Sequence, residues 1–271
     1  MSTFEPATDQ LKVELDGRVA ILTLNRPDAR NALSPEISAG LIEGLKWVAN
    51  EPAVGALVLT GAGSAFCSGG DVKAMGQSRT GPAPSFEAQF QELLARHRGV
   101  GGALYALRKP TIAALPGAAA GAGMAIALAC DLRVAADNAF LTTGYAGIGL
   151  SGDYGVAWLL TRVVGPARAR ELMLTLERVR ADRALEIGLV NRVVPGDQLM
   201  AETMALAHQL ADGPSIAFAY IKDNLDEALS IDHGTAIERE ADRLLKARST
   251  RDYREAVKAF AEKRRPEFKG E

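Results

Sequence analysis

The chain has 271 residues with a formal net charge of −2, and 48% of its residues are hydrophobic. This length can bury one large core, or a main domain with a smaller appendage. Without a basic surplus, nucleic acid and anionic membranes are poor candidates as partners. The only two cysteines, Cys67 and Cys130, argue against a disulfide framework, and residues 1–10 lack a signal-peptide pattern. We therefore expect a cytoplasmic protein.

The first two thirds of the chain alternate predicted strands and helices, which indicates an α/β fold. A strand pair around the Asp16-Gly17 turn opens it, and Ser34 is a predicted helix N-cap with Pro35 at the first helical position. Strands are expected over residues 11–15, 19–24, 54–60, 111–115, 132–136, 139–142 and 189–194. Helices are expected from residue 35, over 86–107, from about 121, from about 156 to 175 with a break at 165–166, and over 181–187.

From Asp197 onward the pattern is entirely helical. We divide the chain into an α/β core, residues 1–196, which would carry the site, and a helical C-terminal region, residues 197–271. This second region could cover the site or bind a neighbouring subunit.

The most informative stretch is residues 111–131, where an apolar strand leads through Pro116-Gly117 into a helix that opens near Gly121. Unpartnered N–H groups in the first turn of that helix, with the positive end of its dipole, suit a carbonyl oxygen that becomes an oxyanion. Three other interpretations compete. A membrane span is disfavoured by the Ala, Gly and Pro content, and a dinucleotide motif by Ile126 in place of its third glycine. Core packing alone stays open.

Glycine-rich loops at residues 61–73 and 144–155 accompany this stretch, and each could be a tight turn only. The order of the motifs favours function. They are Asn25-Arg26-Pro27, Asn31-Ala32-Leu33, Phe66-Cys67-Ser68-Gly69-Gly70-Asp71-Val72-Lys73, Lys109-Pro110, Gly121-Ala122-Gly123, Ala129-Cys130-Asp131-Leu132, Leu160-Thr161-Arg162-Val163-Val164-Gly165 and Phe260-Ala261-Glu262-Lys263-Arg264. This set resembles the crotonase (enoyl-CoA hydratase/isomerase) superfamily, over about residues 11 to 268.

The resemblance implies a spiral of ββα/βαβ units with a C-terminal helical region, assembled as a homotrimer or homohexamer. It implies an acyl-CoA thioester as substrate and no tightly bound cofactor, since coenzyme A enters as part of the substrate. The positions that match the two oxyanion-hole amides are Gly70 and Ala122. The positions implied to contact CoA are Asp28, Ala29, Arg30, Ser68, Asp71, Val72, Lys73, Phe260 and Lys263, the last two in some relatives from a neighbouring subunit.

The sequence departs from the hydratases of this superfamily, which hold a water between two glutamates. Alignment on residues 121–123 and Asp131 places Ala125 and Tyr145 at the glutamate positions. Ala125 cannot move a proton, and Tyr145, with an ordinary pKa near 10, is a poor base at neutral pH. Hydration by the usual route is therefore not expected.

Asp153 is the available carboxylate. It matches an aspartate that relatives use either to move protons along an acyl chain or as a nucleophile in aromatic acyl-CoA dehalogenases. The alternative is structural, because Asp153 lies just before the predicted helix from residue 156 and could be its N-cap. Capping would lower the pKa of the carboxyl, whereas an apolar pocket would raise it.

The other reactive side chains give weaker signals. None of the three histidines has a metal-ligand partner at i+3 or i+4, so we predict no metal site. His97 lies near the position of a helper histidine in some relatives, although direct spacing gives Arg98, and we expect a surface or packing role. Cys67 is expected to be a small buried side chain.

We therefore expect an acyl-CoA enzyme in which Gly70 and Ala122 polarise the thioester, with Asp153 and Tyr145 also in the catalytic site. Double-bond isomerisation with Asp153 as proton shuttle is the leading hypothesis. The alternatives are hydration by a non-standard route, hydrolysis or dehalogenation with Asp153 as nucleophile, and a non-catalytic acyl-CoA binder. Tyr145, Trp158, Phe86 and Phe90 suggest an aromatic or bulky acyl group, or core packing.

Overall fold

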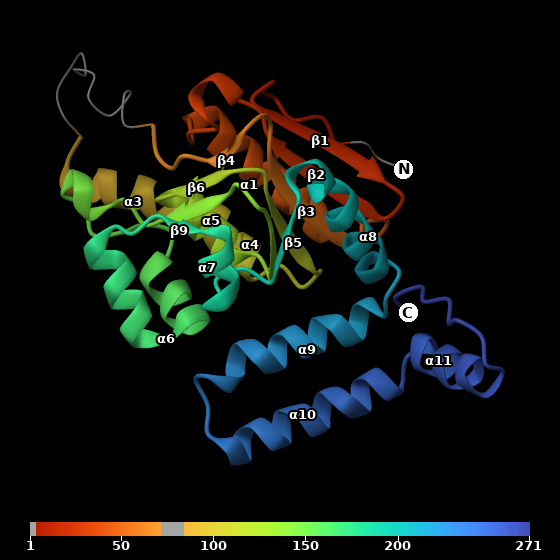
Figure 1. Cartoon of the computed structure of the whole chain (residues 1–271). Coiled ribbons are helices and arrows are strands. Elements are labelled where there is room, and N and C mark those ends of the chain that lie inside the picture. The colour runs from red at the N-terminus through yellow and green to blue at the C-terminus, as the bar shows by residue number, and fades with distance from the viewer. Residues whose placement is uncertain (1–3, 72–83) are drawn as a thin grey trace.

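A computed structural model describes residues 4–71 and 84–271 of the chain, so Val72 and Lys73 lie outside the described residues. The strands form two sheets (Figure 1). The larger has the order β1-β2-β3-β5-β7-β10, and the smaller has the order β4-β6-β8-β9. The strands are β1 Leu11–Asp16, β2 Val19–Leu24, β3 Ala56–Gly61, β4 Ala65–Cys67, β5 Thr111–Leu115, β6 Ala118–Ala120, β7 Leu132–Ala136, β8 Phe140–Thr142, β9 Val179–Arg180 and β10 Arg192–Val194.

The chain moves between the two sheets in a repeating order. The pairs β3–β4, β5–β6 and β7–β8 each contribute one strand to the large sheet and the next strand to the small one. A helical segment follows each pair, and β3, β5 and β7 are parallel, as are β4, β6 and β8. This is the expected spiral of ββα units, and the predicted fold class is confirmed.

The α-helices are α1 Pro35–Asn50, α3 Phe86–His97, α4 Ala103–Tyr105, α5 Ala122–Ala129, α6 Val156–Thr175, α7 Ala181–Glu186, α8 Leu199–Ala211, α9 Ser215–Ala228, α10 His233–Arg248 and α11 Arg251–Ala261. A π-helical turn, Arg98–Gly102, connects α3 to α4. As predicted, the Ser34 side chain caps α1, and α6 has a break at Gly165-Pro166. None of the helices in the described parts of the chain combines the length and apolar character needed to cross a bilayer.

The core lies between the sheets and the helices that cover them. Every residue of β3, β5 and α5 is buried. Helix α5 packs against β4, β6 and α6, while α8 covers β3, β5 and β7. Residues 110–130, which include no charged residue, therefore form a buried strand, a turn and a buried helix.

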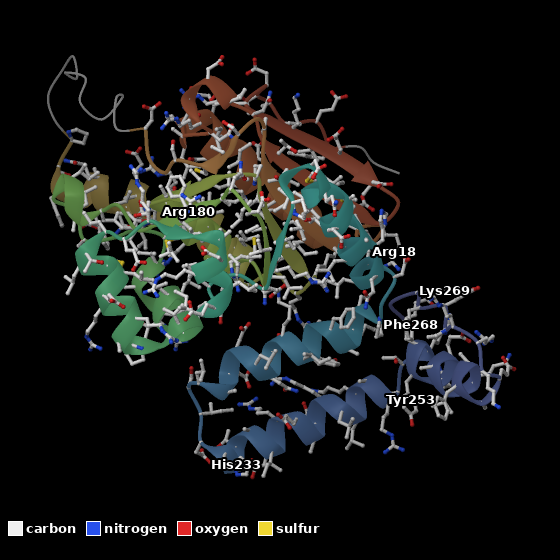
Figure 2. All side chains as sticks on the ribbon, in the orientation of Figure 1. Arg18, Arg180, His233, Tyr253, Phe268 and Lys269 are labelled. Carbon is white, nitrogen blue, oxygen red and sulfur yellow. The ribbon has the colours of Figure 1, made fainter. Side chains whose placement is uncertain are left out.

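Helices α9 to α11 project from this body (Figure 1). Figure 2 shows His233, at the start of α10, and Tyr253, on α11, on this projecting part. Polar contacts connect α9 to the body, including Tyr105–Asp226 and Arg108–Asp223, both 2.7 Å. Since α8 packs on the large sheet, the projecting part begins at α9. The division at residue 196 and its roles stay a prediction.

Two details of the strands differ from expectation. Of the small-sheet strands, β8 was predicted at residues 139–142, whereas β4, β6 and β9, of two or three residues each, were not. The last strand of the large sheet covers only Arg192–Val194, the part that pairs with β7, instead of residues 189–194.

Candidate active site

The first glycine-rich loop leaves β4 at Cys67 and is fixed by an earlier part of the chain. The Leu33 amide donates to the Gly69 carbonyl at 2.8 Å, and the Ser68 amide donates to the Arg30 carbonyl at 3.0 Å. The Ser68 hydroxyl also donates to the Ala29 carbonyl at 3.3 Å. The structure thus brings residues 28–30 against residues 68–71, two of the segments expected to contact CoA.

Asn31 and Arg26 reinforce this connection. Asn31 is fully buried, with a left-handed φ of 56°, and its Nδ2 donates to the carbonyls of Ala62 at 2.9 Å and Ala65 at 2.7 Å. The Arg26 guanidinium lies 3.2 Å from the Asp71 carboxylate. Both contacts hold the chain on either side of Gly70.

The second glycine-rich turn brings the start of α5 next to this loop. Gly121 has a φ of 53°, which favours glycine, and Ala122 is the first helical residue. A Cβ added to Gly69 would lie 2.8 Å from the Ala120 carbonyl oxygen and 3.5 Å from the Ala122 nitrogen, so the two turns are in contact. Within the described ranges, the amides of Gly70 and Ala122 have no hydrogen-bond partner.

Gly123 has a packing role at the start of α5. A Cβ at this position would collide with the carbonyl oxygen of Cys67 and lie 2.7 Å from the Cβ of Cys67. Glycine therefore lets α5 pack directly on β4. Cys67 itself is fully buried, and this burial raises the pKa of its thiol to about 12, so it is a neutral packing residue, as predicted.

A cavity opens beside the two amides, with one lobe of about 330 Å³ and a second lobe of about 180 Å³. Five residues line both lobes: Gly70, Ala122, Tyr145, Leu150 and Asp153. The larger lobe is also lined by Leu33, Ser38, Leu93, Arg96, His97, Ser151, Gly152 and Tyr154. The four predicted catalytic residues therefore border one space.

The Tyr145 hydroxyl donates a hydrogen bond to Oδ1 of Asp153 at 2.5 Å. Burial raises the pKa of Asp153, while the hydrogen bond from Tyr145 and the charge of Arg96 act in the opposite direction. Burial also raises the pKa of Tyr145, so its hydroxyl stays protonated. The pair is thus a carboxyl in a largely apolar space with one fixed donor.

The alternative role of Asp153 as a helix cap is wrong. Helix α6 begins after Gly155, which has a left-handed φ of 77° and no side-chain cap. The Asp153 carboxylate points to Tyr145, and only its main-chain carbonyl accepts from Val156. The side chain is therefore available to the cavity.

The two glutamate positions of the hydratases are occupied very differently. Ala125 is fully buried within α5 and does not line the cavity, whereas Tyr145 does. Asp153 is the one carboxylate among the described residues that line the two lobes.

Helix α3 contributes two charged or titratable side chains to the cavity. The His97 ring packs against the Tyr154 ring in a tilted arrangement, with ring centroids 4.2 Å apart. The pKa of His97 is lowered by burial and by the charge of Arg96. The expected packing role is thus correct but incomplete. Arg96 was missed, although the spacing of Leu93, Arg96 and His97 places them on one helix face.

Several predicted residues lie away from this cavity. Phe260 on α11 is 87% exposed, and neither it nor Lys263 lines the cavity of its own chain. Phe86 and Phe90 are exposed and stack on each other, and Trp158 contacts Tyr105 and Arg162, so none of the three lines it either. Of the four candidates for the acyl pocket, only Tyr145 lines it.

The ββα spiral and this cavity define a crotonase-fold enzyme. A family model described as Enoyl-CoA hydratase/isomerase matches residues 14–271. The chain belongs to the enoyl-CoA hydratase/isomerase family, whose members act on CoA thioesters.

Known proteins resemble the chain over nearly its whole length. The 1,2-epoxyphenylacetyl-CoA isomerase of Escherichia coli K12 is 38% identical over 256 residues, covering 93% of this chain and 95% of that protein. The short-chain-enoyl-CoA hydratase of Clostridium acetobutylicum is 34% identical over 256 residues, covering 94% and 95%. A crystal structure of a putative enoyl-CoA hydratase from Streptomyces coelicolor A3(2) has a TM-score of 0.90 at 37% identity, covering 100% of this chain and 98% of that one.

Proposed function

We propose that the protein moves a double bond along the acyl chain of a CoA thioester, with Asp153 as the proton shuttle. The observation that carries the proposal is the placement of Asp153. It is the one carboxylate among the described lining residues, and it shares the cavity with both candidate oxyanion-hole amides. One base that first takes and then returns a proton suffices for an isomerisation, whereas the usual hydration uses two carboxylates.

The reaction starts with the thioester oxygen between the amides of Gly70 and Ala122. The Asp153 carboxylate removes a proton from the α or γ carbon, and the electron pair moves to the thioester oxygen as an enolate. The two amides, at the end of the small sheet and at the positive end of α5, stabilise that charge. Asp153, now protonated, returns the proton at the other carbon, and the double bond has moved.

The environment of Asp153 supports this role. Burial raises the pKa of its carboxyl above the ordinary value, which makes the carboxylate a stronger base. The Tyr145 hydroxyl donates to one carboxylate oxygen and leaves the other for the substrate. Tyr145 thus orients the base at the position where the hydratases have their second glutamate.

CoA is proposed to lie along Asp28, Ala29 and Arg30 and along Ser68 to Lys73. The hydrogen bonds that join Ala29 and Arg30 to Ser68 support one continuous surface. We propose that the protein has no tightly bound cofactor, because coenzyme A enters as part of the substrate. We also propose that it acts in the cytoplasm.

We also propose a homotrimer, or a homohexamer built from two trimers. Large apolar side chains remain exposed on α9, α10 and α11 and directly after α9, among them Leu225, Leu229, Leu244, Leu245 and Phe260, with exposures from 61% to 87%. Single exposed apolar residues are common on protein surfaces, but a group of them on adjacent helices is typical of a subunit interface. In that assembly, Phe260 and Lys263 would approach the site of a neighbouring subunit.

Hydration remains a second candidate, because the Clostridium relative and the crotonyl-CoA hydratase of Syntrophomonas wolfei, 33% identical, are named as hydratases. The E. coli relative is named as an isomerase of 1,2-epoxyphenylacetyl-CoA, so its name supports isomerisation of a CoA thioester without specifying a double-bond shift. Product analysis with a 2-enoyl-CoA and a 3-enoyl-CoA separates the two, since only hydration yields a 3-hydroxyacyl-CoA.

Asp153→Asn tests the proposal directly. We expect turnover of a 3-enoyl-CoA to be lost, because the amide cannot accept the proton, while acyl-CoA still binds. Unchanged turnover would remove Asp153 from the mechanism. A trapped covalent acyl-enzyme in the wild type would instead indicate Asp153 as a nucleophile, and no deuterium exchange at the α or γ carbon would indicate a binder.

A further inference from the structure

We infer that Arg96 recognises an oxygen atom on the acyl group, so that the preferred substrates are acyl-CoA thioesters with a carboxylate or carbonyl on the acyl chain. The inference rests on the proposed function for the position of the acyl group beside Asp153. It assigns Arg96 as the residue that determines acyl specificity.

Arg96 reaches the larger lobe of the cavity from α3, beside Leu93 and His97. Its Nε is buried and has no hydrogen-bond partner within the described residues. The guanidinium also forms no ion pair or ring contact within those ranges. A partly buried cation with an unused donor therefore borders the candidate substrate space.

Asp153 is not the partner of Arg96. The hydrogen bond to the Asp153 carboxylate comes from Tyr145, and the described residues show no ion pair between Arg96 and Asp153. The guanidinium lines the same lobe as Asp153, His97 and Tyr154. Burial raises the pKa of Asp153 and Tyr154 and lowers that of His97, and the charge of Arg96 acts to lower the pKa of all three. This arrangement leaves the cation near the base without neutralising it.

The chemistry of an unused guanidinium donor favours an oxygen on the ligand. A buried N–H without an acceptor is costly, and a purely hydrocarbon acyl chain would exclude water from Arg96 without supplying one. A carboxylate or carbonyl oxygen accepts from the planar guanidinium and removes that cost. Leu93 and Leu150 in the same lobe would contact the carbon atoms of such a chain. The site therefore discriminates against unsubstituted chains of the same length.

Binding of saturated thioesters tests the inference without catalysis, because they have no double bond to move. Glutaryl-CoA supplies an anionic oxygen group, 4-oxopentanoyl-CoA supplies a neutral carbonyl, and pentanoyl-CoA is the hydrocarbon of the same length. We expect wild-type protein, measured by calorimetry, to bind at least one oxygen-bearing thioester about tenfold or more tightly than pentanoyl-CoA. A preference for glutaryl-CoA alone indicates an anion site, and a preference for both indicates any oxygen acceptor.

Arg96→Met should abolish this preference and leave pentanoyl-CoA binding intact, while Arg96→Lys should retain part of the preference for glutaryl-CoA. Arg98→Met is the matched control, since Arg98 is exposed and does not line the cavity. Its preference should equal that of the wild type. Circular dichroism and the melting temperature verify that each variant is folded.

Two results would overturn the inference: no preference in the wild type, or a preference that survives in Arg96→Met. If Arg96→Met fails to fold, a full preference in Arg98→Met with a reduced or absent preference in the folded Arg96→Lys supports the inference, and equal preference in both contradicts it. If the wild type prefers the oxygen-bearing thioesters but does not isomerise a 3-enoyl-CoA, the proposed function is refuted and the inference on Arg96 is not. The two proposals therefore fail separately.

Discussion

The close approach of α5 to β4 makes Gly123→Ala a sharp test of how the second amide is positioned. The added Cβ would meet the Cys67 carbonyl oxygen, and its next neighbours are the Cβ of Cys67 at 2.7 Å and the carbonyl carbon at 2.8 Å. Two of these three atoms are backbone, so no side-chain rotation relieves the contact. The start of α5, with Ala122, must then move away from β4.

The expected magnitude combines two opposing effects. Overpacking costs up to about 3 kcal/mol. The higher helix propensity of alanine offsets about 1 kcal/mol of that cost. Gly123→Ala should therefore lower the free energy of unfolding by about 2 kcal/mol. The matched control is Gly102→Ala, whose Cβ would lie 3.8 Å from the His97 carbonyl oxygen, in ordinary contact. That variant should be as stable as the wild type or slightly more stable.

Urea unfolding at a fixed protomer concentration measures both variants. We also expect kcat/KM of Gly123→Ala to fall, with the wild-type value retained in Gly102→Ala, since only the first change displaces the Ala122 amide. A Gly123→Ala protein as stable and as active as the wild type would refute the close approach and its role in placing that amide.

Two further variants test the base and the assembly. In Tyr145→Phe, Asp153 loses a hydrogen bond that lowers its pKa, so the pKa rises further and the loss of kcat/KM on acidification should begin at higher pH than in the wild type. If kcat/KM of Tyr145→Phe begins to fall at the same pH as in the wild type or at a lower pH, Tyr145 does not lower the pKa of Asp153. In Leu244→Asp, a charge replaces a 61% exposed side chain of α10, and analytical ultracentrifugation should detect smaller species than in the wild type. An unchanged mass would contradict a role for this face of α10 in assembly.

Features fixed by neighbouring residues could be predicted from the sequence. The Ser34 hydroxyl accepts from the Ile37 amide at 3.0 Å, as the Ser-Pro start of the helix indicates. The hairpin around Asp16-Gly17 pairs Asp16 with Val19, in the expected antiparallel arrangement. In both cases the hydrogen bonds join residues close in sequence, so local chemistry determines the structure.

Strands β4 and β6 of the small sheet could not be predicted in this way. Residues 65–67 and 118–120 are short runs of small or apolar residues, too short to show a period of two. Their extended conformation depends on pairing between successive turns of the spiral. A local pattern contains no information on such pairing.

The same limit explains why capping stayed open as an alternative role for Asp153. Its position before a helix favours capping, and the competing partner, Tyr145, is eight residues away on the other side of a loop. Arg96 approaches from α3, more than fifty residues earlier. Only the folded loop brings the three side chains to one cavity, so their interaction could not be derived from spacing.

The two candidate thioester-binding amides and the acyl-facing side chains come from different parts of the architecture. Gly70 and Ala122 follow β4 and β6, which are hydrogen-bonded neighbours, so the sheet itself sets their separation. The candidate acyl-facing residues instead come mainly from α3 and from residues 145–154. We therefore expect substitutions on α3 to alter substrate range without disturbing the proposed carbonyl contact, which would give this scaffold a route to divergent acyl specificity over evolution.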